Sequence, residues 1–535
     1  MLRHTQLGLG AIGALALVCL ATSVGGGGPL TPVGGAAADS SEPLTSVPGL
    51  DQAALDVMNA PPYTHGQWAI SVQDMDTGEQ VISLNADTVF EPGSVVKTYS
   101  SGAAWLEFGP ESTIVTPVKR TAEVAGGVLA GDLILVGKGD LTMGGRTKAD
   151  GTVDVTNLDH NDANAIPGAT LTPEDPLTGL NELAAQVKAA GIDSITGEVI
   201  VDNRLWDTHE LAGQPITPMI INQNVIDLTT TATTPGQPAT AEISPGVSPW
   251  TLDVQVQTVA AGGVTKITTG SVDEKTIVLT GTIAADSGPV VNIYTFKDPA
   301  TFARTAYIEA LGRAGVSVAA DPLAANPASV LPDYAVVDAL PSVAELISLP
   351  LQQEATYVLK ISYNRGAETF ICRLAIAAGK TECTEGITRA AEIWSAAGLN
   401  TTTASLIDGS GLDGNLITPN NQVQLQTIMA NRSDAALWKA TLPILGVDGS
   451  LFQVQANSPA KGMVSAKTGT LVSADVFNNR LRMPTKALGG YIDTQGGRRF
   501  AFAIMATNSF VADINGVLAA NEDVGTVAAI IQQDY

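Results

Sequence analysis

The strongest constraint on the fold is a strand pattern that recurs near both ends of the 535-residue chain. Residues 68–85 contain two strand-like runs around Asp76-Thr77-Gly78, which is typical of a hairpin with Gly78 at positive φ. Three more runs, "GMVSAKTGTL" from about Val464, "ALGGYID" and "RRFAFAIMA", follow in the last third of the chain. One antiparallel sheet built from both ends makes the middle of the chain an insertion.

Helix signals accompany these strands. A helix is predicted from about Gly93 to Gly109, with Ser94 at its N-terminus, where the helix dipole favours negative charge. A second, amphipathic helix is predicted over residues 521–535. Two helices with clear start and stop residues are predicted inside the insertion, at 181–191 and 298–315. Helices on the faces of an antiparallel sheet indicate an α+β fold.

Length and charge limit the organisation and the partners. A chain of 535 residues is too long for one typical domain and predicts two to four compact units. The formal net charge is −25, from 53 acidic and 28 basic residues. Because such a chain repels phosphates and anionic lipids, we expect no nucleic-acid partner and no anionic membrane surface.

The first 38 residues differ in composition from the rest. One Arg and no acid precede an apolar run from Leu7 to about Val24, and a Gly- and Ala-rich stretch follows. This pattern predicts a secretory signal and flexible linker over residues 1–38, cleaved after Ala38 or Ala21. An uncleaved anchor is the alternative, and Val18 before Cys19 disfavours a lipoprotein. We expect no stable membrane span after processing.

Two cysteines remain for the mature chain, Cys372 and Cys383. In an exported protein their spacing fits one disulfide that closes a short loop, and two buried thiols are the alternative. No C-x-x-C pair is present to bind zinc or to carry out redox chemistry.

Three short motifs occur in a fixed order along the chain. "SVVK" spans Ser94 to Lys97, "SYN" spans Ser362 to Asn364, and "KTGT" spans Lys467 to Thr470. A second S-x-x-K at Ser458 lies only a few residues before Lys467, so it leaves no room for a fold between the motifs. S-x-x-K, S-x-N and K-T-G together are the set used by serine enzymes that react with penicillin.

The chemistry of acyl transfer accounts for these residue types. A serine hydroxyl needs a base within reach, and positions three apart on a helix share a face, so Lys97 can serve Ser94. Lysine is a base only when neutral, and burial together with a second cation, Lys467, would lower its pKa. Two backbone N–H groups would stabilise the developing oxyanion.

The trio, its order and the long insertion resemble the class C low-molecular-mass penicillin-binding proteins, the D-alanyl-D-alanine carboxypeptidase/endopeptidases. The resemblance also includes "GDLILVGKGDLTM", "IDGSGLDGN" and "LPILGVDGSL". It implies a penicilloyl-serine transferase domain over residues 45–115 plus 340–535, and an insertion of two smaller domains over 116–339. It further implies an exported serine peptidase, periplasmic or associated with the cell wall, that needs no cofactor and no metal. Its substrates would be peptidoglycan stem peptides, and β-lactams would be covalent inhibitors.

The resemblance assigns roles to the motif residues. Ser94 would be the acylated nucleophile and Lys97 its base, while Ser362 would pass a proton to the departing D-alanine and Asn364 would hold the substrate amide. The substrate's terminal carboxylate would face the third motif, and the oxyanion hole would be formed by the N–H groups of Ser94 and Thr470; the third motif contributes Lys467, Thr468, Gly469 and Thr470. Tyr363 departs from the Asp or Asn usual at that position, which we expect to alter packing or specificity.

Rival functions stay open at this point. A β-lactamase would need fast deacylation, and a non-catalytic cell-wall binding protein could keep the same fold. A Ser-His-Asp hydrolase is disfavoured, because no G-x-S-x-G is present. We interpret "DHND", Asp159 to Asp162, as a loop rather than a metal site, whereas Asp408-Gly-Ser-Gly fits either a simple turn or a functional loop.

Overall fold

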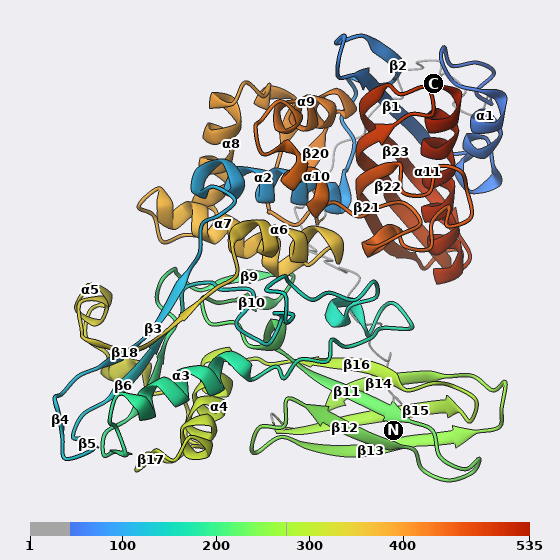
Figure 1. Ribbon diagram of the computed structural model, residues 1–535. Coiled ribbons are helices and arrows are strands. Elements are labelled where there is room, and N and C mark those ends of the chain that lie inside the picture. Colours follow the sequence, from blue (N-terminus) through green and yellow to red (C-terminus); the bar gives the residue numbers. More distant parts are fainter. Residues whose placement is uncertain (1–42, 274, 413) are drawn as a thin grey trace, which may run out of the picture.

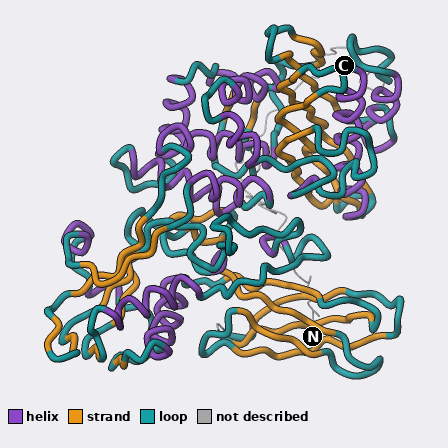
Figure 2. The backbone as a smooth tube through the Cα atoms, in the orientation of Figure 1, coloured by secondary structure: helices purple, strands orange, loops and turns teal. Residues whose placement is uncertain are grey.

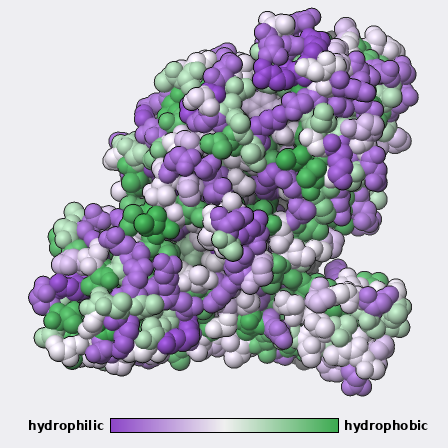
Figure 3. Space-filling model, in the orientation of Figure 1, coloured by the Kyte–Doolittle hydropathy of each residue, from purple (hydrophilic) through white to green (hydrophobic). Residues whose placement is uncertain are grey.

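The computed structural model describes residues 43–535 except 274 and 413, so the predicted signal and linker at 1–38 lie outside the described residues. The chain forms an upper block from both of its ends and a lower block from its middle (Figure 1). Figure 3 shows polar and apolar side chains intermixed over one face of both blocks.

The upper block contains a five-stranded sheet in the order β2-β1-β23-β22-β21, with every neighbouring pair antiparallel. Its strands are β1 (Gln67–Asp74), β2 (Gln80–Leu84), β21 (Val464–Asp475), β22 (Arg480–Asp493) and β23 (Arg499–Val511). The sheet therefore joins the two ends of the chain, as predicted. β21 is an edge strand, which matters for the site below.

Side chains of alternating size along β23 explain how the sheet is covered. Phe500, Phe502 and Ile504 lie in one buried cluster, with residues of α1 (Gln52–Met58) and α11 (Ile514–Asp534). The small intervening residues lie in the opposite cluster, under the helices of the other face; they are Ala501 and Ala503. Among the described residues α11 is the one helix long and apolar enough to cross a membrane, and here its apolar side packs on the sheet.

The second face is covered by helices, shown in purple in Figure 2. They are α2 (Lys97–Phe108), α6 (Leu351–Lys360), α7 (Asn364–Ala377), α8 (Glu385–Ala396), α9 (Pro419–Ala430) and α10 (Ala435–Thr441). Trp105 of α2 meets Trp438 of α10 edge to face, with ring centroids 5.5 Å apart. α2 is buried along most of its length, because sheet and helices enclose it on several sides.

The lower block has two parts. One part combines a sheet in the order β18-β3-β6-β8 with a small sheet in the order β17-β7-β5-β4 and the helices α3 to α5. The strands are β3 (Val115–Arg120), β4 (Val124–Ala125), β5 (Val128–Leu129), β6 (Leu133–Val136), β7 (Ser194–Ile195), β8 (Val199–Asp202), β17 (Ser317–Val318) and β18 (Ser342–Ile347). The helices are α3 (Thr178–Ala189), α4 (Pro299–Arg313) and α5 (Tyr334–Asp338).

The other part consists of two three-stranded sheets, in the orders β12-β11-β16 and β13-β15-β14. Their strands are β11 (Val225–Thr231), β12 (Thr240–Ser244), β13 (Thr251–Val259), β14 (Lys266–Ser271), β15 (Thr276–Ala284) and β16 (Val290–Thr295). Two short pairs complete the chain, namely β9 (His209–Leu211) with β10 (Gln214–Ile216) and β19 (Ala404–Ser405) with β20 (Leu416–Ile417). The α+β fold with a long two-part insertion is confirmed, while the boundaries at 116 and 339 stay a prediction.

Two local predictions can be compared directly with the structure. The helix expected from Gly93 begins as a separate 3₁₀ turn, η2 (Gly93–Val96), and becomes α-helical only at Lys97. Cys372 of α7 and Cys383 form a disulfide, which decides between the bridge and the two free thiols that the sequence left open.

Candidate active site

The first motif places a serine and a lysine in hydrogen-bond contact. Ser94 lies half-buried in η2, and Lys97 opens α2 one turn later. The Lys97 Nζ atom is 2.7 Å from Ser94 Oγ, and the Lys97 side chain is completely buried. The helical spacing therefore produces the contact that a nucleophile and its base require.

Two further acceptors fix the Lys97 amine. Its Nζ donates to Asn364 Oδ1 at 2.6 Å and to the Ser410 carbonyl at 2.7 Å. Asn364 is the first residue of α7, and Ser410 belongs to the Asp408-Gly-Ser-Gly loop. Segments from three distant parts of the chain thus meet at one amine.

Burial makes Lys97 suitable as a base. Desolvation lowers the pKa of Lys97 to about 7, although the negative charges of Asp408, Asp162 and Glu368 act to raise it. A substantial fraction of such an amine is neutral near pH 7, and a neutral amine can accept the proton of a serine hydroxyl.

The second motif meets the third through Ser362. Lys467 Nζ donates to Ser362 Oγ at 2.9 Å and to the Thr468 carbonyl at 2.9 Å. Ser362 has φ of 62°, a left-handed conformation that costs free energy in a residue other than glycine. The surrounding structure therefore imposes this backbone conformation, which sets the direction of the Ser362 hydroxyl.

The two motif lysines repel each other, and this repulsion affects Lys467. Burial lowers the pKa of Lys467 well below its usual value, and the charges of Lys97 and Lys486 lower it further. The sequence predicted that burial and the charge of Lys467 would both lower the pKa of Lys97. In the structure, burial is the cause that lowers the pKa of Lys97.

The third motif lies on the edge strand β21, directly beside η2. A Cβ atom at Gly469 would come 2.0 Å from the carbonyl oxygen of Pro92, so only glycine permits this approach. The neighbouring Thr468 Oγ1 is 2.8 Å from Ser450 Oγ. The close approach at Gly469 therefore holds β21 against η2. Thr468 and Thr470, on either side of Gly469, line the cleft.

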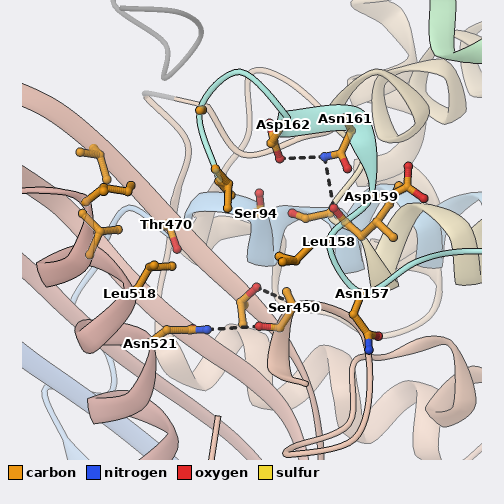
Figure 4. A pocket seen from close by; sticks show the side chains of 18 of the residues that line it. Ser94, Asn157, Leu158, Asp159, Asn161, Asp162, Ser450, Thr470, Leu518 and Asn521 are labelled. Atoms are coloured by element: carbon orange, nitrogen blue, oxygen red, sulfur yellow. Dashed lines mark hydrogen bonds between the residues drawn. The ribbon is translucent and has the colours of Figure 1, made fainter. Parts of the chain in front are cut away.

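A cleft of about 450 Å³ lies between these segments (Figure 4). The motif residues that line it are Ser94, Ser362, Asn364, Thr468 and Thr470. Lys97 and Lys467 are buried behind this wall and reach it through the two serine hydroxyls. The structure thus brings all eight predicted site residues together, with Gly469 as the contact between strand and turn.

The Asp408-Gly-Ser-Gly loop is part of the site, beyond forming a turn. One carboxylate oxygen of Asp408 accepts hydrogen bonds from the backbone N–H groups of Ser410 and Gly411, at 2.7 and 2.6 Å. This arrangement directs the Ser410 carbonyl at Lys97. The sequence left the two interpretations of the loop open, because its target lies far away along the chain.

The "DHND" loop of the insertion forms the opposite wall of the cleft. It holds the short turn η3 (His160–Asp162), and Figure 4 shows Asn161 and Asp162 near Ser94. Asp159 is paired with Arg146 at 2.6 Å, and His160 Nδ1 is 2.6 Å from an Asp227 carboxylate oxygen. Sequence analysis missed this role, because nothing in the loop shows that the insertion folds back over the nucleophile.

Tyr363, the unusual residue of the second motif, turns away from the cleft. It is buried and packs against Tyr357, with ring centroids 5.3 Å apart. A Cβ atom on Gly366 would come 2.4 Å from its ring. The Tyr363 side chain therefore acts on the packing beneath the motif, and it does not line the cleft.

Comparison with known proteins identifies the family of the chain. The model of the D-Ala-D-Ala carboxypeptidase 3 (S13) family matches residues 51–522. The chain belongs to this family. The resemblance to penicillin-binding proteins of the D-alanyl-D-alanine carboxypeptidase type is thereby confirmed, and the protein is a serine-type D-Ala-D-Ala carboxypeptidase.

Individual relatives cover most of the chain. A D-alanyl-D-alanine carboxypeptidase of Actinomadura sp. (strain R39) is 27% identical over 462 residues, which are 82% of this chain and 77% of the relative. A penicillin-sensitive carboxypeptidase A of Dictyostelium discoideum is 24% identical and covers 83% of each chain.

A solved structure supports the fold independently. The crystal structure of penicillin-binding protein 4 from Haemophilus influenzae matches with a TM-score of 0.66 and 18% identity. The match covers 88% of this chain and 98% of the other. The sheet, its helices and the insertion therefore share the fold of that solved structure.

Proposed function

We propose that this S13 protein is an exported peptidase that cleaves D-Ala-D-Ala ends or cross-links of peptidoglycan stem peptides through an acyl-enzyme on Ser94. The observation that carries the proposal is the 2.7 Å contact between Lys97 Nζ and Ser94 Oγ at the base of an open cleft. β-Lactams would acylate the same hydroxyl.

The first half-reaction begins with proton transfer. Neutral Lys97 takes the hydroxyl proton of Ser94 while Oγ attacks the substrate carbonyl carbon and forms a C–O bond. The N–H groups of Ser94 and Thr470 would stabilise the oxyanion, each at about 3 kcal/mol. Asn364, which accepts a hydrogen bond from Lys97, also holds the base in place.

The leaving group needs a proton and an anchor. When the C–N bond breaks, Ser362 gives its proton to the departing nitrogen and is resupplied through Lys467, 2.9 Å away. Thr468 and Thr470 hold the terminal carboxylate of a substrate that lies along the edge strand β21. Water then attacks the ester carbonyl and gives up a proton, through Ser362, to Lys467; as the acyl C–O bond to Ser94 breaks, Lys97 returns its proton to Ser94 Oγ.

Two features support export. The apolar run near Leu7 predicts a secretory signal, and the Cys372–Cys383 disulfide is stable in oxidising compartments outside the cytosol. Peptidoglycan would be accessible to an enzyme in that location.

The proposal is tested with a diacylated tripeptide ending in D-Ala-D-Ala and with a labelled penicillin. We expect release of D-alanine and a penicilloyl-enzyme that persists for minutes. Rapid release of the label would instead indicate a β-lactamase. Absence of both D-alanine release and label would contradict the proposed reaction.

A further inference from the structure

A third lysine lies in the cleft wall, and none of the three motifs contains it. Lys486 is on β22, where it pairs directly with Thr470 of β21. It lines the cleft together with Ser94, although the residue is only 4% exposed. Its Nζ atom donates a hydrogen bond to Thr470 Oγ1 at 2.7 Å.

This contact determines what Thr470 can do. In its protonated form Lys486 only donates, so the Thr470 oxygen is then the acceptor and its hydroxyl hydrogen must point elsewhere. Thr470 is half-buried and lines the cleft beside Ser94 (Figure 4). The hydroxyl hydrogen is thus available to a ligand in the cleft, which would have to be an acceptor.

The charge of Lys486 also favours an anionic ligand. Burial lowers the pKa of Lys486 to about 7, and no carboxylate among the described residues contributes to raising it. Lys360, another buried lysine, is paired with Asp448 at 2.7 Å. A carboxylate bound beside Thr470 would supply the compensating charge that the described protein groups do not supply to Lys486.

We propose that Lys486 is a positioning residue that selects substrates ending in a free carboxylate, by directing the Thr470 hydroxyl at that carboxylate and placing a positive charge behind it. The inference rests on the proposed function, since it assumes that acyl transfer to Ser94 takes place. It extends carboxylate recognition from the third motif to the neighbouring strand β22.

The test compares two acyl donors that give the same acyl-enzyme. One is a diacylated tripeptide ending in D-Ala-D-Ala, which has a carboxylate on its leaving group. The other is the matching D-alanyl thioester with an uncharged leaving group. Values of kcat and KM are measured on the full chain for wild type, Lys486→Met, Lys486→Gln and Lys486→Arg.

For Lys486→Met we expect kcat/KM on the D-Ala-D-Ala donor to fall about tenfold or more, mainly through KM, because a charge-assisted contact is lost. On the thioester we expect a change of less than about twofold, since no carboxylate is bound. Lys486→Arg should restore most of the loss. Lys486→Gln, which can still donate to Thr470 but carries no charge, should fall between them and also serves if Lys486→Met does not fold.

A matched control is Lys119→Met. Lys119 is also buried, but it lies on β3 of the insertion and donates to the carbonyls of Asp338 and Leu340. This variant should not change the ratio of the two kcat/KM values.

The outcomes separate the two proposals. Equal losses on both donors in Lys486→Met and Lys486→Gln, or no loss on either, would overturn the role of Lys486 alone. A wild-type enzyme that cleaves neither donor would overturn the proposed function itself.

Discussion

The two sides of the cleft hold their lysines among different neighbouring charges. On the helix side, Lys97 is buried among groups whose negative charge raises its pKa, namely Asp408, Asp162 and Glu368. On the strand side, Lys467 lies near Lys97 and Lys486, whose charges lower its pKa, and among the described residues Asp162 is the one negative group that acts to raise it. Burial is shared by both sides, so the difference lies in the neighbouring charges.

This difference suggests a division of function between proton transfer on one side of the cleft and anion binding on the other. The helix side has a serine bonded to an amine whose pKa is about 7, which suits proton transfer. The strand side has hydroxyls backed by two buried lysine amines, and a bound anion would stabilise their protonated form. If the division is correct, helix-side changes should slow every acyl donor, and changes to the Lys486–Thr470 contact on the strand side should affect only donors with a carboxylate.

The largest effect is expected for Ser94→Ala on the helix side. Loss of the nucleophile should reduce kcat at least about 10⁴-fold on both donors. Ser458→Ala is the matched control, because Ser458 and Lys461 repeat the S-x-x-K spacing in a loop. Steady-state rates check the pair; equal effects of the two substitutions would remove the basis for assigning the first motif.

Lys97→Met should have the next largest effect. Removal of the base should lower kcat about 10²- to 10⁴-fold on both donors, with KM on the thioester changing little. A loss confined to the D-Ala-D-Ala donor would place Lys97 on the carboxylate side and break the comparison.

The pH profile tests the same residue without substitution. Because Lys97 must be neutral to accept a proton, and its pKa is about 7, activity is lost as the amine becomes protonated at lower pH. Below pH 7, kcat/KM on the thioester should fall about tenfold per pH unit, and above pH 8 it should be level. The thioester is used since Lys486 does not contribute to its binding. A profile that is flat from pH 5 to 8 would contradict the assignment of Lys97.

A smaller effect is expected for Thr470→Val on the strand side. It should raise KM for the D-Ala-D-Ala donor about tenfold and leave the thioester unchanged. In the double variant with Lys486→Met the losses should not add, because both act through one contact. Additive losses would show that the two residues act separately.

The smallest effect on activity is expected for the disulfide. Replacing both Cys372 and Cys383 by Ala should lower the free energy of unfolding by about 2–3 kcal/mol, measured by denaturant titration. Activity should change by less than about threefold, since neither side of the cleft contains the bridge. A greater loss of kcat would show that α7 needs the bridge to hold Asn364.

The fold was predictable where local patterns and motif order agree. Hydrophobic periodicity and turn residues within single segments predicted three elements. These are the Gly78 hairpin, the strand that carries Lys467 and the amphipathic C-terminal helix. The strand pattern at both ends also predicted the insertion. The family resemblance then divided it into two smaller domains and named the residues from Ser94 to Thr470 that the structure brings together.

Other parts of the site could not be predicted, because their function depends on distant contacts. Ser410 acts through a backbone carbonyl, which leaves no signature in the side chain. Asp162 reaches the cleft only because the insertion folds over the cleft. Lys486 contributes only because the register of β21 and β22 places Lys486 beside Thr470. The 3₁₀ turn at Ser94 could not be predicted either, because helix propensity does not distinguish a 3₁₀ turn from an α-helix.

The most direct test of the account is the mass of the intact protein after reaction with benzylpenicillin, followed by mapping of the modified peptide. The account predicts a single penicilloyl adduct on the peptide that contains Ser94, present in Ser458→Ala and absent in Ser94→Ala. An adduct on another residue, or an adduct that persists in Ser94→Ala, would contradict it.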